Sequence, residues 1–159
     1  SYAGTTGRFA LITAPADEDT NARPHRYLDF SRVEDFLIAM NQQRGASDIW
    51  MESVIDAIRM IIDPENPLNL SWREDSVKRI VIFSDEPPQN NIVQPEISWE
   101  DLGDLLDQLD IPVYIFSNSQ QWETITTLSG GEYFRISDRT QDIADNLTAI
   151  IDDDSCLEE

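Results

Sequence analysis

Short apolar segments alternate with amphipathic segments along the chain. Five of the apolar segments are rich in β-branched and aromatic residues and are flanked by Gly, Pro, Asn or Ser, which is typical of strands. These predicted strands are Arg8–Thr13, Tyr27–Phe30, Arg79–Phe83, Pro112–Phe116 and Tyr133–Ile136.

Other segments carry apolar residues at the three- and four-residue spacing of a helix that buries one face. The predicted helices are Val33–Met40, Asp48–Ile62, Trp99–Leu109, Gln121–Leu128 and Thr140–Ile151. Residues that favour the start or the end of a helix support two of these boundaries. Ser31 is a good N-cap for the first helix, and Pro64 follows the end of the second.

The order of these elements predicts an α/β fold: a doubly wound, mostly parallel sheet with helices on both faces. The continuously apolar segments Ile80–Phe83 and Val113–Phe116 suit central parallel strands. The first two strands are joined by a polar segment, Ala14–Arg26, that has no helical pattern. Because such a connection most simply makes a hairpin, we expect one antiparallel edge strand.

Length and charge narrow the class of protein. The 159 residues suit a single domain, 1–159, which ends in an acidic tail at 152–159. With 31 acidic and 11 basic side chains, the formal charge is −20. A surface this negative repels phosphate backbones and anionic lipids, so we expect no nucleic-acid partner. The apolar runs are too short for a membrane span, and the start of the chain does not resemble a signal peptide.

The side chains that most catalytic sites use are scarce. The one histidine, His25, and the one cysteine, Cys156, do not assemble a Ser-His-Asp or Cys-His set, and they exclude a Cys-rich zinc cluster. We therefore expect no enzyme; a metal-dependent hydrolase that uses Asp85 is disfavoured because no general base is evident. Cys156 is either a free thiol on a tail or half of a disulfide whose partner lies outside this chain.

Polar residues follow the two central strands, where ligands bind in an open parallel sheet. Ser84-Asp85-Glu86 comes after the first of them and Ser117-Asn118-Ser119 after the second. A carboxylate at the end of an apolar strand must be solvated, capped or bound to a cation, since an unpaired buried charge is costly. Asp85 therefore either caps the turn or holds a cation.

A second acidic group precedes the long helix at Asp48 and Glu52. One interpretation is that Asp48 caps the helix and that Glu52 favours its positive N-terminus. The other is that their oxygens, with Asp85, hold a divalent ion such as Mg²⁺, which prefers oxygen ligands. Trp50 between them is either an exposed contact or a hydrophobic staple at the helix start.

Four segments resemble the von Willebrand factor A (VWA) domain. Trp72–Gln89 looks like its strand that ends in Ser-Asp, and Glu52–Ile58 is similar to a helix start in the integrin-β-like branch. Ile111–Phe116 and Leu128–Phe134 resemble the last two strands and the Gly-Gly before the final one. The resemblance runs from about Arg8 to Ile151.

The resemblance implies a metal-ion-dependent adhesion site that binds Mg²⁺, Mn²⁺ or Ca²⁺ and takes a carboxylate from a partner protein. By residue-by-residue carry-over its metal ligands are Asp85, Glu52 and, more loosely, Asp48. Next to this site, we expect Trp50, Ser84 and Glu86 to contact the partner. The family context also implies an extracellular or cell-surface location.

One difference from the family leaves two alternative hypotheses for the function. The Asp-x-Ser-x-Ser loop is absent from the chain, as are the first strand and the first helix of the family's fold. We expect an N-terminal segment of the same domain, or a separate chain, to complete the sheet. The chain is then either a non-enzymatic adhesion module that binds a protein through a metal ion, or a structural domain of a larger assembly with a degenerate, metal-free site.

Overall fold

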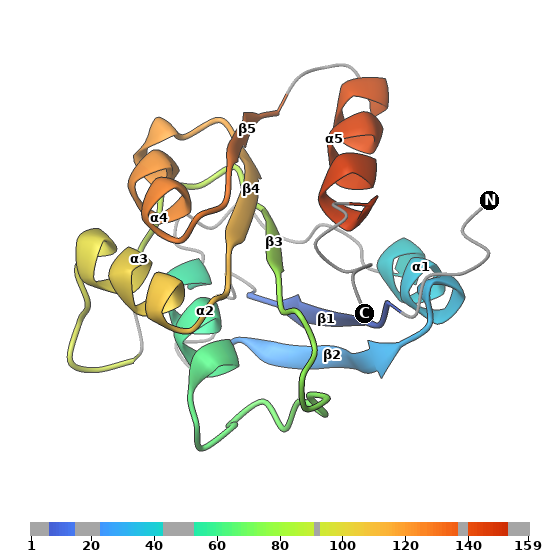
Figure 1. Ribbon diagram of the computed structural model, residues 1–159, viewed down its shortest axis with the longest axis horizontal. Coiled ribbons are helices and arrows are strands. Elements are labelled where there is room, and N and C mark those ends of the chain that lie inside the picture. The colour runs from blue at the N-terminus through green and yellow to red at the C-terminus, as the bar shows by residue number, and fades with distance from the viewer. Residues whose placement is uncertain (1–6, 15–22, 43–52, 91–92, 137–139, 153–159) are drawn as a thin grey trace. The chain divides into compact units, whose positions relative to one another are not determined.

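The computed structural model describes residues 7–14, 23–42, 53–90, 93–136 and 140–152 (Figure 1). The chain divides into two compact units. The first combines Ser1–Glu74 with Pro88–Glu96, and the second combines Asp75–Pro87 with Ile97–Glu159. Each unit is described below by itself.

The first unit contains an antiparallel hairpin and two helices. Strands β1 (Phe9–Thr13) and β2 (His25–Ser31) pair in the hairpin, and helix α1 (Val33–Gln42) packs against both. The rings of Phe9 and Phe36 join the hairpin to α1, with centroids 5.4 Å apart. Helix α2 (Val54–Ile62) follows later in the unit. The antiparallel pair predicted from the helix-free connection is confirmed.

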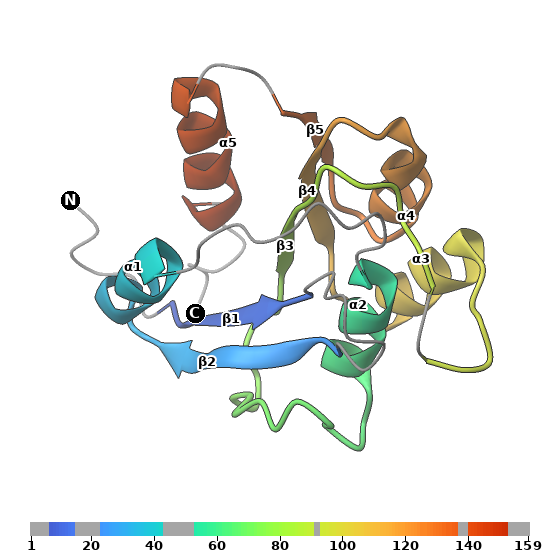
Figure 2. The ribbon, with the colours of Figure 1, turned by 180° about the vertical axis from the view of Figure 1, so that it is seen from behind.

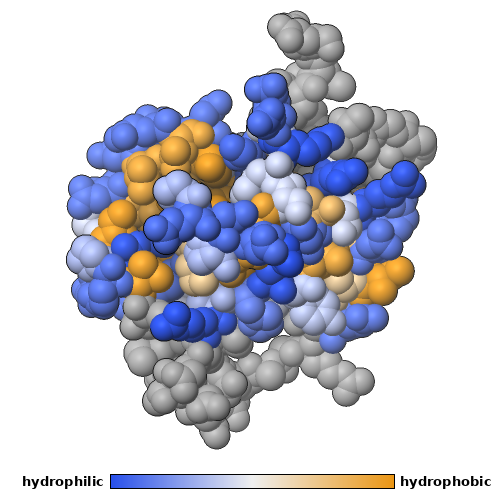
Figure 3. Space-filling model, turned by 90° about the horizontal axis from the view of Figure 1, so that it is seen from below, coloured by the Kyte–Doolittle hydropathy of each residue, from blue (hydrophilic) through white to orange (hydrophobic). Residues whose placement is uncertain are grey.

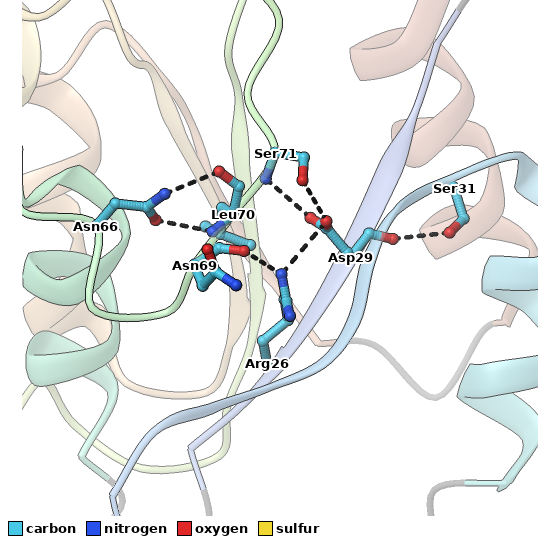
Figure 4. A network of polar contacts seen from close by, with 7 residues as sticks. All are labelled: Arg26, Asp29, Ser31, Asn66, Asn69, Leu70 and Ser71. Atoms are coloured by element: carbon cyan, nitrogen blue, oxygen red, sulfur yellow. Dashed lines mark hydrogen bonds and ion pairs between the residues drawn. The ribbon is translucent and has the colours of Figure 1, made fainter.

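A polar network fastens the segment after α2 to β2 (Figure 4). The Asp29 carboxylate accepts hydrogen bonds from the backbone nitrogen (3.0 Å) and the hydroxyl (2.6 Å) of Ser71, and it pairs with Arg26 at 3.3 Å. Nearby, the Phe30 and Trp72 ring centroids lie 4.5 Å apart. Burial raises the pKa of Asp29, but the hydrogen bonds from Ser71 and the other lowering contacts outweigh it, and the pKa is lowered. The carboxylate therefore stabilises this segment in its ionised form.

The second unit is built on a three-stranded parallel sheet. Its strands are β3 (Ile80–Phe83), β4 (Val113–Ser117) and β5 (Tyr133–Arg135), in the order β3-β4-β5 (Figure 2). Phe83, Phe116 and Phe134 occupy one row across the strands and stack with centroid distances of 4.8 and 4.9 Å. The two apolar segments predicted as parallel strands are thus adjacent, with β4 central.

Helices complete the second unit: α3 (Trp99–Gln108), α4 (Glu123–Leu128) and α5 (Thr140–Asp152). Helices α3 and α4 pack against each other, and α4 also contacts β4 and β5. Side chains from these helices, from β4 and from the turn before α4 are fully buried, at 0% exposure: Leu102, Leu106, Val113, Ile115, Phe116, Trp122 and Ile125. Apolar burial of this kind, worth roughly 25 cal/mol per Å², is the main stabilising contribution.

Some boundaries differ from the prediction. Strand β2 begins at His25 rather than Tyr27, and the predicted helix from Gln121 is split into a 3₁₀ turn, Gln120–Trp122, and α4. The predicted second helix is seen from Val54 onward, and its first five residues lie outside the described part of the chain. The mixed α/β class, with parallel strands and an antiparallel pair, is confirmed, although the described strands form two separate sheets.

The coloured part of the face seen in Figure 3 is largely hydrophilic, with several separate hydrophobic patches. Among the described residues, the large apolar side chains with the greatest exposure are Ile38, Val77, Leu37, Phe83 and Leu109. No helix among the described residues has the length and apolar character needed to cross a membrane.

Candidate ligand-binding edge of the parallel sheet

The three parallel strands of the second unit end at one edge of their sheet, which we call the carboxyl edge. It comprises Ser84–Glu86 after β3, Asn118–Gln120 after β4, and the end of β5 at Arg135 with Ile136. Because all strands run the same way, their ends gather here without any further adjustment of the chain. This is the edge at which the sequence predicts a ligand.

The turn after β3 is held by its neighbours and leaves Asp85 exposed. Ser84 is buried, its backbone nitrogen donates to the Phe116 carbonyl at 3.2 Å, and its hydroxyl accepts from the Glu86 nitrogen at 3.2 Å. The indole nitrogen of Trp122, itself fully buried, donates to the Glu86 carbonyl at 2.9 Å. Among the described residues, the hydrogen bond that closes this turn is accepted by the Ser84 hydroxyl. The exposed Asp85 carboxylate is therefore accessible to solvent or to a ligand.

The ends of β4 and β5 are tied together by one carbonyl group. The Ser117 carbonyl accepts from the Ile136 nitrogen at 3.1 Å and from the Tyr133 hydroxyl at 2.8 Å. The fully buried Ser117 hydroxyl accepts from the Ser119 nitrogen at 3.1 Å and so shapes the loop that leaves β4. These contacts give this half of the carboxyl edge a fixed backbone.

A polar pocket of about 260 Å³ opens between these two strand ends and is lined by Asn118, Gln120, Tyr133 and Arg135. The sequence pattern singles out the loop after β4 but not Gln120, Tyr133 or Arg135. One feature of the sequence does mark Arg135: after Arg79, it and Arg139 are the only basic side chains in the chain.

Three of the predicted site residues, Asp48, Trp50 and Glu52, lie outside the described residues, as does Cys156. The first residue described after Glu52 is Ser53, which is 3% exposed. Its hydroxyl oxygen has no hydrogen-bond partner among the described residues. Because an unsatisfied buried hydroxyl costs about 1–3 kcal/mol, this oxygen is suited to accept a ligand or a further polar group.

The predicted divalent metal ion can be tested against these donors. Carboxylate oxygens, such as those of Asp85, are among the ligand types that Mg²⁺ prefers. Among the described residues, no group of three Asp, Glu, His or Cys side chains is close enough to hold an ion. A metal ion at Asp85 therefore needs ligands beyond this set, and Glu52 and Asp48 are the predicted ones.

No protein-family model and no curated protein matches the chain. Among solved structures, the VWA domain of SpRpn10 is similar, with a TM-score of 0.56 and 15% sequence identity. The match covers 88% of this chain and 71% of that one. Together with the parallel sheet and its helices, this likeness shows that the fold is VWA-like.

Proposed function

We propose that the chain is a non-enzymatic, protein-binding module of the VWA type that engages its partner at the carboxyl edge. The observation that carries this proposal is the exposed Asp85 on a turn whose other groups are engaged by Ser84 and Trp122. A carboxylate presented on a rigid turn costs little to order when it binds a cation or a partner. The VWA-like fold supports the proposal at the level of the fold alone.

In its more specific form, the proposal gives this edge a divalent cation, Mg²⁺ with Mn²⁺ or Ca²⁺ as substitutes. Asp85 and Glu52 would be ligands and Asp48 an auxiliary one, while Trp50, Ser84 and Glu86 would contact the partner. The cation would supply a positive charge that binds a carboxylate of the partner protein. The resemblance to the integrin-β-like branch supports this form, and with it an extracellular or cell-surface location.

Thermal unfolding tests the metal-dependent form. A ligand that binds only the native state raises its stability by RT ln(1 + [L]/Kd), about 2.7 kcal/mol when the free ion is at a hundredfold excess over Kd. We expect the melting temperature of the chain to be higher in Mn²⁺ or Mg²⁺ than in EDTA, and the difference to vanish in Asp85→Asn.

The matched control is Asp104→Asn, which removes another exposed carboxylate of the second unit, on α3. This variant should keep the full metal-dependent shift. An unchanged melting temperature in the unaltered chain, or an equal loss of the shift in both variants, would overturn the metal-dependent form.

A second candidate function is a structural module of a larger assembly with a metal-free site. The open edge of β3 favours it. Strand β3 pairs with β4 on one side, and no described strand pairs with its other side. The Ile80 nitrogen donates to the Pro112 carbonyl just before β4, and the Ser84 nitrogen donates to the Phe116 carbonyl in β4. Because backbone groups alternate in direction along a parallel ladder, those of Val81 and Phe83 point to the open side.

The side chains at this edge are apolar and partly uncovered: Val81 is 37% exposed and Phe83 is 49% exposed. Strand β3 has no charge or proline, the features that usually protect an edge strand from pairing. The partner that fits is an extended apolar strand from outside these residues, either a preceding segment of the same protein or a separate chain.

Amide hydrogen exchange distinguishes this second candidate. In the chain alone, the Val81 and Phe83 amides should exchange faster than the Ile82 amide, which faces β4. Slow exchange of Val81 and Phe83 in the absence of any partner would contradict an open edge.

A further inference from the structure

The polar pocket beside β5 has a lining rich in hydrogen-bond donors. The guanidinium of Arg135 has five N–H groups, and the amides of Asn118 and Gln120 have two each. The Tyr133 hydroxyl already donates to the Ser117 carbonyl, which holds its ring in place as a wall of the pocket. A pocket whose free groups are mostly donors is suited to a ligand made of acceptors.

Arg135 has no counter-ion among the described residues, although the chain has 31 acidic side chains. It is the one described cation in the sequence after Arg79. A guanidinium presents its N–H groups as a planar fork that matches the two oxygens of a carboxylate. Within the described part of the chain, the guanidinium of Arg135 is therefore available to a carboxylate of another molecule.

The net negative charge of the protein favours the binding of a singly charged anion over a doubly charged one. Coulomb repulsion scales with the charge of the ligand, so a phosphate dianion is repelled about twice as strongly as a carboxylate by a chain of charge −20. The amides of Asn118 and Gln120 can donate to the oxygens of a carboxylate beside the guanidinium. The volume of about 260 Å³ is large enough for a single acidic side chain or a chain terminus.

We propose that Arg135, with Asn118 and Gln120, binds a carboxylate group of the partner protein directly, without a metal ion. The proposal rests on the proposed function in one respect, that a protein partner docks at the carboxyl edge. It adds a second recognition point on β5, separate from Asp85 on the turn after β3, and it assigns the chemistry of that point.

The test is an NMR titration of the ¹⁵N-labelled chain, in excess EDTA, with capped amino acids that mimic one residue of a peptide. N-acetyl-glutamic acid amide should bind with a Kd of roughly millimolar order and shift the amide signals of Asn118, Gln120 and Arg135. N-acetyl-glutamine amide, the neutral match, should bind at least about tenfold more weakly, because an ionised acceptor makes the stronger hydrogen bonds. A peptide that ends in a free carboxylate on an uncharged residue shows whether a chain terminus is also accepted.

Arg135→Gln should weaken binding of the glutamate peptide by about tenfold or more. Arg32→Gln removes the same charge from an exposed site before α1 in the first unit and should leave binding unchanged. Since Arg135 is exposed, its variant should fold, which the amide spectrum itself would show.

Equal binding of the glutamate and glutamine compounds, or an equal loss of binding in Arg135→Gln and Arg32→Gln, would overturn the proposal that Arg135 binds a carboxylate. Binding that requires a divalent ion and disappears in EDTA would also overturn it, while leaving the metal-dependent proposal intact. Conversely, binding of the glutamate compound in EDTA, together with a melting temperature that does not depend on metal, would support carboxylate binding at Arg135 and contradict the metal-dependent form of the proposed function.

Discussion

Gly131, between α4 and β5, makes a close backbone contact that only glycine permits. A Cβ atom at this position would lie 1.9 Å from the Val113 carbonyl oxygen and 2.5 Å from its carbonyl carbon. Both are backbone atoms of the central strand, so no rotation of a side chain can relieve the overlap. We predict that Gly131→Ala separates the end of α4 from β4.

The cost follows from the contacts that this separation breaks. The Gly131 nitrogen donates to the Thr126 carbonyl at 2.9 Å, and the Val113 nitrogen donates to the Ser129 hydroxyl at 3.1 Å. Two lost hydrogen bonds cost about 1 kcal/mol each, and forcing an extra methyl group into a packed site costs about 1–3 kcal/mol more. We therefore expect Gly131→Ala to lower the free energy of unfolding by about 3 kcal/mol or more.

Gly130→Ala is the matched control because it adds the same methyl group one residue earlier. Nothing lies within 4 Å of a Cβ there, but the residue has a φ of +77°, which costs a non-glycine residue about 1–2 kcal/mol. Urea unfolding followed by circular dichroism gives both values from the midpoints at constant slope. If Gly131→Ala is no more destabilising than Gly130→Ala, the described approach of this turn to β4 is wrong.

Three further predictions concern stability. Asp29→Asn should lower the free energy of unfolding by about 1–2 kcal/mol at pH 7, measured by urea unfolding. Because folding lowers the Asp29 pKa, this difference should be complete above the ordinary pKa of 3.8 and should disappear as the pH falls through the folded-state pKa. A difference in stability that does not depend on pH would contradict this prediction. Trp122→Phe should cost about 1 kcal/mol or more through the lost hydrogen bond to the Glu86 carbonyl, and the Glu86 amide signal should shift; an unmoved signal would argue against that contact. Leu102→Ala, at 0% exposure, should cost about 2–5 kcal/mol in the same assay, whereas Leu109→Ala, at 43%, should cost under about 1 kcal/mol; equal costs would be inconsistent with the described packing of α3.

The fold was predictable where the pattern of apolar residues has a single structural solution. The continuously apolar segments Ile80–Phe83 and Val113–Phe116 predicted adjacent parallel strands, and they pair in that way, although Val81 and Phe83 on one face of β3 stay partly exposed. The hairpin followed from the missing crossover helix. The start of β2 at His25 was not predictable, because on a two-stranded edge a polar residue can pair as well as an apolar one.

The sequence covers the candidate site only in part. Asp85 stays a prediction, made because a carboxylate directly after an apolar strand is conspicuous in the sequence. The pocket residues Arg135 and Gln120 were not predicted, because they lie 15 residues apart in sequence and meet through the pairing of β4 with β5. Tyr133 reads as an ordinary strand residue, and its hydrogen bond to Ser117 depends on the register of those strands. Pairing of distant strands leaves no local pattern in the sequence.

The central claim, that the carboxyl edge of the parallel sheet binds a ligand at Asp85, is tested most directly by adding Mn²⁺ to the ¹⁵N-labelled chain. The paramagnetic ion broadens the NMR signals of nearby amides. At substoichiometric Mn²⁺ we predict selective broadening of the Ser84, Asp85 and Glu86 signals, and its loss in Asp85→Asn. Broadening that instead follows the exposed carboxylates of α3, such as Asp104, or that persists in Asp85→Asn, would contradict the account.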